Sequence, residues 1–166
     1  DLRGTDVSAD LTTAEGRKFM VDEVARLSGG TIDTIYAVAG LATPTVATVE
    51  VNFFGAVATL EGLRPLLAGS KNPRAVVVAS MASLQQVDDE LTAAMKAGDE
   101  AKALARAAVL AEHPETTGGL IYSSSKRALA LWVRRNAATP EWAGAGIPLN
   151  AAAPGVIATP MTTQYT

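Results

Sequence analysis

The strongest strand signal in the chain is the stretch Ala75-Val76-Val77-Val78-Ala79, an uncharged run with three consecutive valines. The turn dipeptide Asn72-Pro73 precedes this run, and Ser80 follows it. A short apolar run bounded by turn signals is typical of a buried strand in a parallel sheet. We therefore expect residues 75–79 to form such a strand.

Helices and strands alternate on both sides of that strand. Before it we expect a helix over residues 12–27, a buried strand over 31–39 and a helix over 46–68. After it we expect a helix over residues 119–137 and a last strand over 147–153. This alternation favours an α/β fold, a doubly wound parallel sheet of Rossmann-like, three-layer α/β/α type, covered on both faces.

The helix expected over residues 12–27 has recognisable ends. Thr12 and Glu15 have the spacing of a capping box, in which each side chain satisfies a free amide of the first turn. Gly29 and Gly30 then stop the helix, since glycine adopts the left-handed conformation that commonly ends one.

Residues 84–117 interrupt the alternation with a helical insertion inside a single domain of residues 1–166. Leu91 and Met95 share one helical face, and Leu104 and Ala108 share another. The charged residues between them form a solvated outer face. The insertion either covers a binding cleft or contributes to a subunit contact.

Composition excludes several classes of protein. The 166 residues carry a net charge of −3, with 48% apolar residues, which excludes a disordered chain and gives no electrostatic case for nucleic-acid binding. We expect no membrane-spanning helix, because no uncharged apolar run approaches about 20 residues. The chain has no cysteine, which fits a cytoplasmic protein, and its one histidine, His113, is expected to end a helix; no metal site is predicted.

Tyr122 and Lys126 lie four residues apart on the helix expected over 119–137, and therefore on one of its faces. An ammonium group near a phenol favours the phenolate, which allows a tyrosine to exchange a proton with a carbonyl or alcohol oxygen. Taken alone, this spacing is more typical of an exposed surface pair. Ser80 favours the catalytic interpretation, because it follows the carboxyl end of a strand, where open α/β sheets bind ligands.

Asn52 lies within the helix expected over 46–68, although asparagine is a poor helix former. It is either a polar residue that faces water or an amide that organises a water molecule for proton transfer. Its apolar neighbours Val51 and Phe53 favour the second interpretation.

Five motifs follow one another along nearly the whole chain. They are Ala39-Gly40 after a strand, Asn52 in an Asn-x-x-Gly pattern, Ser80 after the valine run, Tyr122-Ser123-Ser124-Ser125-Lys126, and Asn150-Ala151-Ala152-Ala153-Pro154-Gly155. In this order they resemble the short-chain dehydrogenase/reductase family. Within it the chain is most similar to the bacterial 3α-hydroxysteroid dehydrogenase/carbonyl reductase branch, which shares the helical insertion and a stretch like residues 9–17.

The resemblance implies an NAD(H)-dependent oxidoreductase that interconverts a secondary alcohol and a ketone. Tyr122 would be the general acid/base, and Lys126 would lower the pKa of that phenol and hold the nicotinamide ribose. Ser80 would steady the substrate oxygen. Asn52 would hold a water molecule that links Lys126 to solvent.

The resemblance also implies which residues bind the cofactor. Asp10 and Leu11 match positions that flank the adenine ring, and Ala39 and Gly40 match positions beside the adenine-side ribose. The segment that grips the nicotinamide end is matched by Pro154, Gly155, Ile157 and Thr159. Within that segment, Ile157 would bond the carboxamide through its backbone.

Asp1 matches the acidic residue that hydrogen-bonds both hydroxyls of the adenine ribose in the family. A carboxylate there would repel a 2′-phosphate, so NAD(H) is expected in preference to NADP(H). Alternatively, Asp1 is simply a solvated residue at the end of the sequence.

Two features depart from the family pattern. Residues 37–40 read Ala-Val-Ala-Gly where the family has Asn-Asn-Ala-Gly. The loop Gly-x-x-x-Gly-x-Gly, which supplies backbone amides to the pyrophosphate, occurs nowhere in the 166 residues, and the family's final strand is also missing. We therefore expect a domain that is incomplete at both ends.

The alternative function is a catalytically silent nucleotide-binding or scaffold protein of the same fold. The intact set of Asn52, Ser80, Tyr122 and Lys126 argues against it, because a scaffold needs no such cluster of polar groups. The expected partners are a small alcohol or ketone, which the sequence leaves unidentified, and further copies of the chain in a homodimer or homotetramer. No nucleic-acid or membrane partner is expected.

Overall fold

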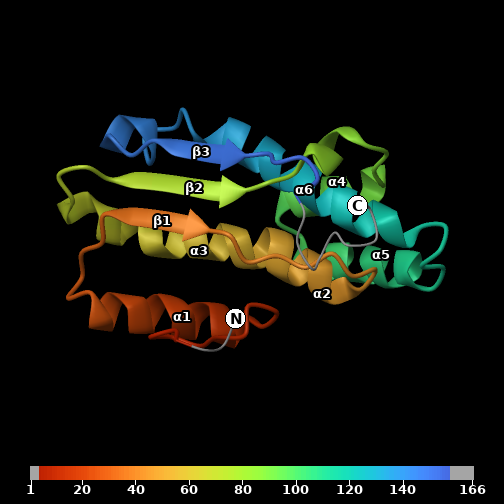
Figure 1. The fold of residues 1–166 in the computed structure, drawn as a ribbon, viewed down its shortest axis with the longest axis horizontal. Coiled ribbons are helices and arrows are strands. Elements are labelled where there is room, and N and C mark those ends of the chain that lie inside the picture. Colours follow the sequence, from red (N-terminus) through yellow and green to blue (C-terminus); the bar gives the residue numbers. More distant parts are fainter. Residues whose placement is uncertain (1–3, 158–166) are drawn as a thin grey trace.

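The computed structural model describes residues 4–157, and its centre is a three-stranded parallel sheet (Figure 1). The strands are β1 (Thr34–Ala37), β2 (Arg74–Val78) and β3 (Leu149–Ala152), and β2 lies in the middle. The valine run therefore forms the central one of these strands. The prediction of a parallel α/β sheet with flanking helices is confirmed.

The α-helices of the described residues are α1 (Ala14–Leu27), α2 (Val46–Val49), α3 (Ala56–Leu63), α4 (Asp89–Ala97), α5 (Glu100–Ala111) and α6 (Gly118–Asn136). Short helical turns are η1 (Glu50–Gly55), η2 (Arg64–Gly69), η3 (Met81–Leu84) and η4 (Ala143–Ala145). The helices α4 and α5 lie beyond the carboxyl ends of the strands (Figure 1).

The sheet buries one of its two faces. Ile35, Ala75 and Leu149 are neighbours across the three strands, and all three are buried. On the opposite face, the next row places Tyr36 beside Val76, and the Tyr36 side chain is 70% exposed. Within residues 4–157, β1 therefore buries one face only, with Ile35 and Ala37 buried and Tyr36 exposed.

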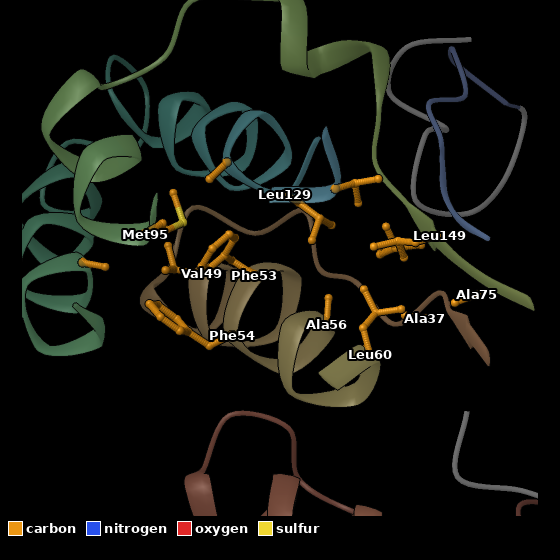
Figure 2. Close-up of a cluster of buried hydrophobic side chains, with 14 of the residues drawn as sticks. Ala37, Val49, Phe53, Phe54, Ala56, Leu60, Ala75, Met95, Leu129 and Leu149 are labelled. Carbon is orange, nitrogen blue, oxygen red and sulfur yellow. The ribbon is translucent and has the colours of Figure 1, made fainter. Parts of the chain in front are cut away.

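The apolar core fills the space between the covered face of the sheet and the helices (Figure 2). Leu60 of α3 and Leu129 of α6 are completely buried there, as is Val77 of β2. Burial of each such side chain contributes about 1.5–3 kcal/mol. Sheet and helices are thereby held in one fixed arrangement around the carboxyl ends of the strands.

Helix α1 begins one residue later than its sequence signal. Thr13 is the N-cap, because its side chain accepts a hydrogen bond from the Gly16 amide, 3.0 Å away. Thr12 is not the cap; its amide and hydroxyl both donate to the Asp10 carboxylate. The predicted capping box of Thr12 and Glu15 is therefore wrong, whereas the predicted glycine stop is correct: Gly29 and Gly30 have positive φ.

The helical run expected over residues 46–68 is not a uniform α-helix. Its first turn, α2, passes into the π-helical η1, and α3 then ends in the 3-10 turn η2, which contains Pro65 near its start. Such π turns occur frequently at functional sites. Asn52 lies within η1, so the local widening of the helix coincides with a candidate site residue.

The same run, residues 46–69, is long and apolar enough in composition to cross a membrane. Half of its most apolar window is buried within the protein, and buried core helices of soluble proteins pass the same test. This finding departs from the expectation that no such segment exists. It is weak support for a membrane span.

Between β2 and α6 the chain forms the helices α4 and α5, which pack against each other and which we call the α4–α5 pair. Leu91 and Met95 are buried as expected, but α5 buries Ala103 and Ala107 rather than Leu104 and Ala108. The predicted face was displaced by one residue, because an alanine-rich helix gives almost the same pattern on adjacent faces.

Candidate active site

The end of β2 presents a serine hydroxyl. Ser80 follows the strand in an extended conformation and caps η3, where its side chain accepts a hydrogen bond from the Ala82 amide at 3.1 Å. No acceptor for the hydroxyl hydrogen is found among residues 4–157, so this hydrogen is available to a ligand oxygen.

Helix α6 places a phenol and an ammonium on one face. The Lys126 Nζ lies 5.8 Å from the centre of the Tyr122 ring and donates to the Val78 carbonyl at 2.8 Å, which ties α6 to the end of β2. Lys126 is 4% exposed, and burial lowers its pKa to about 8. The Tyr122 hydroxyl has no hydrogen-bond partner within residues 4–157.

Asn52 is completely buried, which excludes the interpretation that it faces water. Its Oδ1 accepts from the Leu41 amide at 2.8 Å, and its Nδ2 donates to the Leu41 carbonyl at 2.9 Å and to the Ser125 hydroxyl at 3.2 Å. The side chain therefore joins the turn after β1 to α6. Its Oδ1 keeps one lone pair for a further donor.

The three serines between Tyr122 and Lys126 are all buried and all bonded. Ser123 donates to the Gln86 carbonyl, and Ser124 accepts from the Asp88 amide. Ser125 accepts from Asn52 and donates to the Tyr122 carbonyl. The start of the α4–α5 pair and the turn after β1 are thus fastened to the same face of α6.

Ser80 and Tyr122 line one cavity of about 590 Å³. The other lining residues carry no formal charge, and they are Ala42, Thr43, Pro44, Met81, Ala82, Gln85, Pro114, Gly118, Gly119, Gly155 and Val156. The lining therefore suits an uncharged molecule, and Ser80 and Tyr122 supply hydroxyl groups that can bind its polar atom.

Gly40 lies close to Asn52 and Lys126. A Cβ atom at this position would lie 3.3 Å from the Asn52 Oδ1 and 3.5 Å from the Lys126 Nζ. The absence of a side chain therefore leaves room for the amide and the ammonium to approach the turn after β1. The neighbouring Ala39 is exposed.

The Pro154–Gly155 segment borders the same cavity. The Met81 amide donates to the Pro154 carbonyl at 3.0 Å, and Gly155 is one of the lining residues. Ile157 is 57% exposed. Thr159, like Asp1 at the other end, lies outside the described residues.

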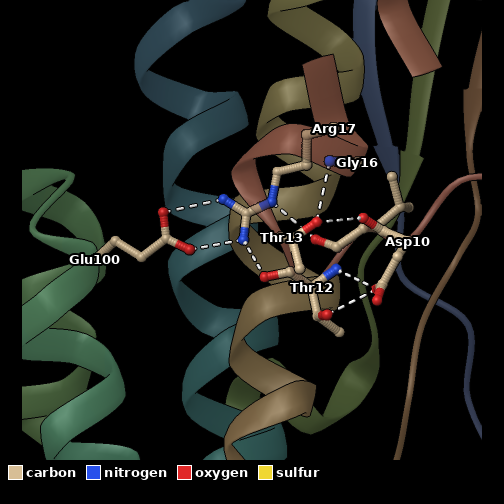
Figure 3. Close-up of polar contacts among 7 residues, drawn as sticks. Asp10, Thr12, Thr13, Gly16, Arg17 and Glu100 are labelled. Carbon is tan, nitrogen blue, oxygen red and sulfur yellow. Dashed lines mark hydrogen bonds and ion pairs between the residues drawn. The ribbon is translucent and has the colours of Figure 1, made fainter. Parts of the chain in front are cut away.

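Asp10 and Leu11 are not among the residues that line the cavity, and both lie in the loop before α1, where Figure 3 shows Asp10. The Asp10 carboxylate accepts hydrogen bonds from the side chain and amide of Thr12, which lower its pKa. Leu11 packs against Gly55, where an added Cβ would lie 3.1 Å from the Leu11 Cβ. The structure thus holds this loop against η1, the element that contains Asn52.

Sequence patterns did not identify several residues of the cavity wall. Ala42, Thr43 and Pro44 follow β1, and Gly118 and Gly119 precede Tyr122 by about one helical turn. The sequence could have indicated them only by their position, either just after the end of a strand or just before the tyrosine. Alanine, proline and glycine carry no chemistry of their own that would have singled them out, and a lone threonine hydroxyl is a weak signal.

Replacement of Asn52 by alanine is expected to lower the free energy of unfolding by about 2 kcal/mol, because it leaves buried Leu41 backbone groups without partners. Urea denaturation measures this change. The matched control is Asn136→Ala, which removes a single bond to the Trp132 carbonyl at the end of α6. Equal effects of the two substitutions would contradict a bracing role for Asn52.

No protein-family model matches the chain. The sequence is 42% identical to the 3-alpha-hydroxysteroid dehydrogenase/carbonyl reductase of Comamonas testosteroni over 168 aligned positions. This match covers 97% of the chain and 63% of the relative, so the chain spans somewhat less than two thirds of that protein's length.

Solved structures with the same fold include the 3-alpha-hydroxysteroid dehydrogenase from Pseudomonas sp. B-0831 in complex with NADH. That protein is 37% identical, and the match has a TM-score of 0.83 and covers 95% of this chain and 61% of that one. A short-chain dehydrogenase from Streptomyces avermitilis is 19% identical, with a TM-score of 0.65 over 93% of this chain and 49% of its own, and shares the fold.

Proposed function

We propose that this chain belongs to the short-chain dehydrogenase/reductase family and that the protein is an NAD(H)-dependent oxidoreductase that interconverts a secondary alcohol and a ketone. The observation that carries the proposal is the shared cavity of Ser80 and Tyr122. Both residues line one cavity whose other lining residues carry no formal charge, and the buried Lys126 ammonium lies one helical turn along α6 from the phenol, 5.8 Å from its ring centre.

Each residue has a distinct part in the proposed reaction. In ketone reduction, the Tyr122 hydroxyl gives its proton to the substrate oxygen, and the charge of Lys126 stabilises the phenolate that remains. Ser80 donates a hydrogen bond to the same oxygen. Asn52 fixes the turn after β1 and holds, through its free lone pair, a water molecule that returns a proton toward Lys126.

A nicotinamide cofactor supplies or accepts the hydride when it is bound. The residues present fit such a group: within residues 4–157 the Lys126 ammonium makes one hydrogen bond, to Val78, and so retains donors for a ribose hydroxyl. Gly40 leaves the space in front of that ammonium free of a side chain.

The remaining cofactor contacts are proposals on the family pattern. We assign the adenine side to Asp10, Leu11 and Ala39, and the nicotinamide end to Pro154, Gly155 and Ile157. Asp1 and Thr159 are assigned in the same way, although both lie outside the described residues. NAD(H) rather than NADP(H) is proposed because of the Asp1 carboxylate, and the Pseudomonas relative was solved with NADH.

The domain organisation, the oligomeric state and the cellular location are also proposals. We propose a single domain with the α4–α5 pair as its insertion, a homodimer or homotetramer, and a cytoplasmic location. The lack of cysteine supports a reducing compartment. Sedimentation of the intact protein distinguishes these assemblies from a monomer.

The function is tested by incubating the intact protein with NADH and a panel of ketones, and by following nicotinamide absorbance. We expect oxidation of NADH that depends on the ketone, and faster turnover with NADH than with NADPH. Binding of NADH without any ketone-dependent oxidation would support a catalytically silent nucleotide-binding protein instead.

A further inference from the structure

Arg17 is a buried cation outside the cavity, and its guanidinium bonds to two separate parts of the chain (Figure 3). Its Nη1 and Nη2 donate to the two carboxylate oxygens of Glu100 at 3.0 and 2.6 Å, a bidentate ion pair. Its Nε donates to the Leu11 carbonyl at 2.8 Å and its Nη2 also to the Thr12 carbonyl at 3.1 Å. Four hydrogen bonds therefore fix this side chain.

The ion pair joins distant segments. Arg17 stands in the first turns of α1, and Glu100 is the first residue of α5, 83 positions later. Arg17 is 9% exposed at its side chain and Glu100 36%, so the pair is partly shielded from water. Bidentate pairs of arginine with a carboxylate fix orientation as well as distance.

Arg17 also holds the loop of residues 10–12 in place. The loop carbonyls at Leu11 and Thr12 accept the two remaining Arg17 bonds, so a displaced guanidinium leaves both without that donor. A Cβ at Gly16 would lie 1.9 Å from the Asp10 carbonyl oxygen, which shows how closely the loop lies on α1. A shift in the position of the Arg17 guanidinium is therefore expected to shift the backbone at Asp10 and Leu11.

A second acidic residue makes the Glu100 contact selective. Glu50 of η1 is only partly exposed, and desolvation raises its pKa while the Arg17 charge lowers it. Glu50 makes no ion pair with Arg17 among the salt bridges of residues 4–157, whereas Glu100 does so with both oxygens. With the Glu100 charge removed, Glu50 would be left as the acidic residue whose charge acts on Arg17.

We propose that Arg17 and Glu100 form a positioning contact through which the α4–α5 pair fixes the loop of residues 10–12 for the adenine end of the cofactor. This inference rests on the proposed function, because it takes Asp10 and Leu11 as adenine-flanking residues. Both residues act through the loop backbone and touch no reacting atom. The contact therefore sets affinity for NAD(H) and leaves the chemical step unchanged.

The test compares Glu100→Gln with Glu112→Gln in the intact protein. Both substitutions remove one negative charge from the same stretch of chain, but Glu112 lies exposed at the end of α5 and makes no ion pair within residues 4–157. Glu100→Asp, which keeps the charge, is the conservative variant. Thermal unfolding confirms that all three proteins fold.

Two measurements are made. Hydrogen–deuterium exchange without cofactor is expected to be faster in the peptide of residues 10–17 for Glu100→Gln only. Calorimetry is expected to show about tenfold weaker NADH binding for Glu100→Gln, with partial recovery in Glu100→Asp, and the KM for NADH rises while kcat stays within about twofold.

The outcomes separate this inference from the proposed function. Unchanged exchange in Glu100→Gln, or faster exchange with unchanged NADH affinity, overturns the positioning contact and leaves the oxidoreductase proposal intact. A wild-type protein that binds NADH but reduces no ketone overturns the oxidoreductase proposal, while the binding data still decide the contact. Equal effects of Glu100→Gln and Glu112→Gln overturn the contact as well.

Discussion

Replacement of Tyr122 by phenylalanine is expected to lower kcat for ketone reduction by about a thousandfold, because the substrate oxygen loses its proton donor. The ring itself is retained, so the cavity and the 5.8 Å contact with Lys126 should persist. No partner within residues 4–157 depends on the lost hydroxyl, and the free energy of unfolding should therefore change little. Steady-state kinetics with NADH and a reduced ketone measure the effect.

The matched control is Tyr36→Phe. Tyr36 is 70% exposed on the uncovered face of the sheet, so this variant removes a tyrosine hydroxyl without touching the cavity. It should retain wild-type kcat. Equal rates for wild type and Tyr122→Phe would refute the assignment of Tyr122 as general acid, and with it the main support for the proposed chemistry.

Local sequence patterns predicted a helix or strand correctly where a single local preference decides its position. The valine run forms β2 because β-branched side chains suit a buried strand, and Gly29 and Gly30 end α1 through positive φ. The start of α1 was misplaced because Asp10 competes for the groups of Thr12. Such competition between neighbouring side chains is decided by loop geometry, which the residue types alone do not specify.

The site was predictable in part for a related reason. Tyr122 and Lys126 share a helix, so their spacing alone places them together, and Ser80 follows from the position of a strand end. The partners of Asn52 are different, because Leu41 and Ser125 lie 11 and 73 positions away. The contact between Arg17 and Glu100 likewise depends on how α5 folds back, and no spacing within either segment indicates it.

Burial of the Lys126 ammonium is expected to lower the free energy of unfolding at neutral pH. Burial lowers the pKa of this ammonium from 10.5 to about 8, so the folded protein holds a proton there less strongly than the unfolded chain. At pH 7 both states are protonated, and the full cost of the buried charge is present. Between pH 8 and 10.5 the unfolded chain binds more protons, so the contribution of this group to the free energy of unfolding rises with pH.

Replacement of Lys126 by methionine is therefore expected to abolish ketone reduction and yet to stabilise the protein at pH 7. Each pKa unit corresponds to about 1.4 kcal/mol, so removal of the cost adds about 3 kcal/mol. Loss of the bond to the Val78 carbonyl subtracts about 1 kcal/mol, which leaves a net gain of about 2 kcal/mol. The gain should disappear near pH 11, where the lysine is neutral in both states.

Urea denaturation of the variant and the wild type at pH 7 and at pH 11 measures this difference, and groups that titrate in both proteins cancel. Lys71→Met is the control, because Lys71 is exposed in the turn before β2 and its removal should change stability little at either pH. The prediction would be contradicted by a Lys126→Met protein that is less stable than the wild type at pH 7, or equally stabilised at both pH values. Either result would show that burial of the ammonium group does not lower the free energy of unfolding. In that case the ammonium would be compensated within the site, and Lys126 would serve mainly as a structural link between α6 and β2.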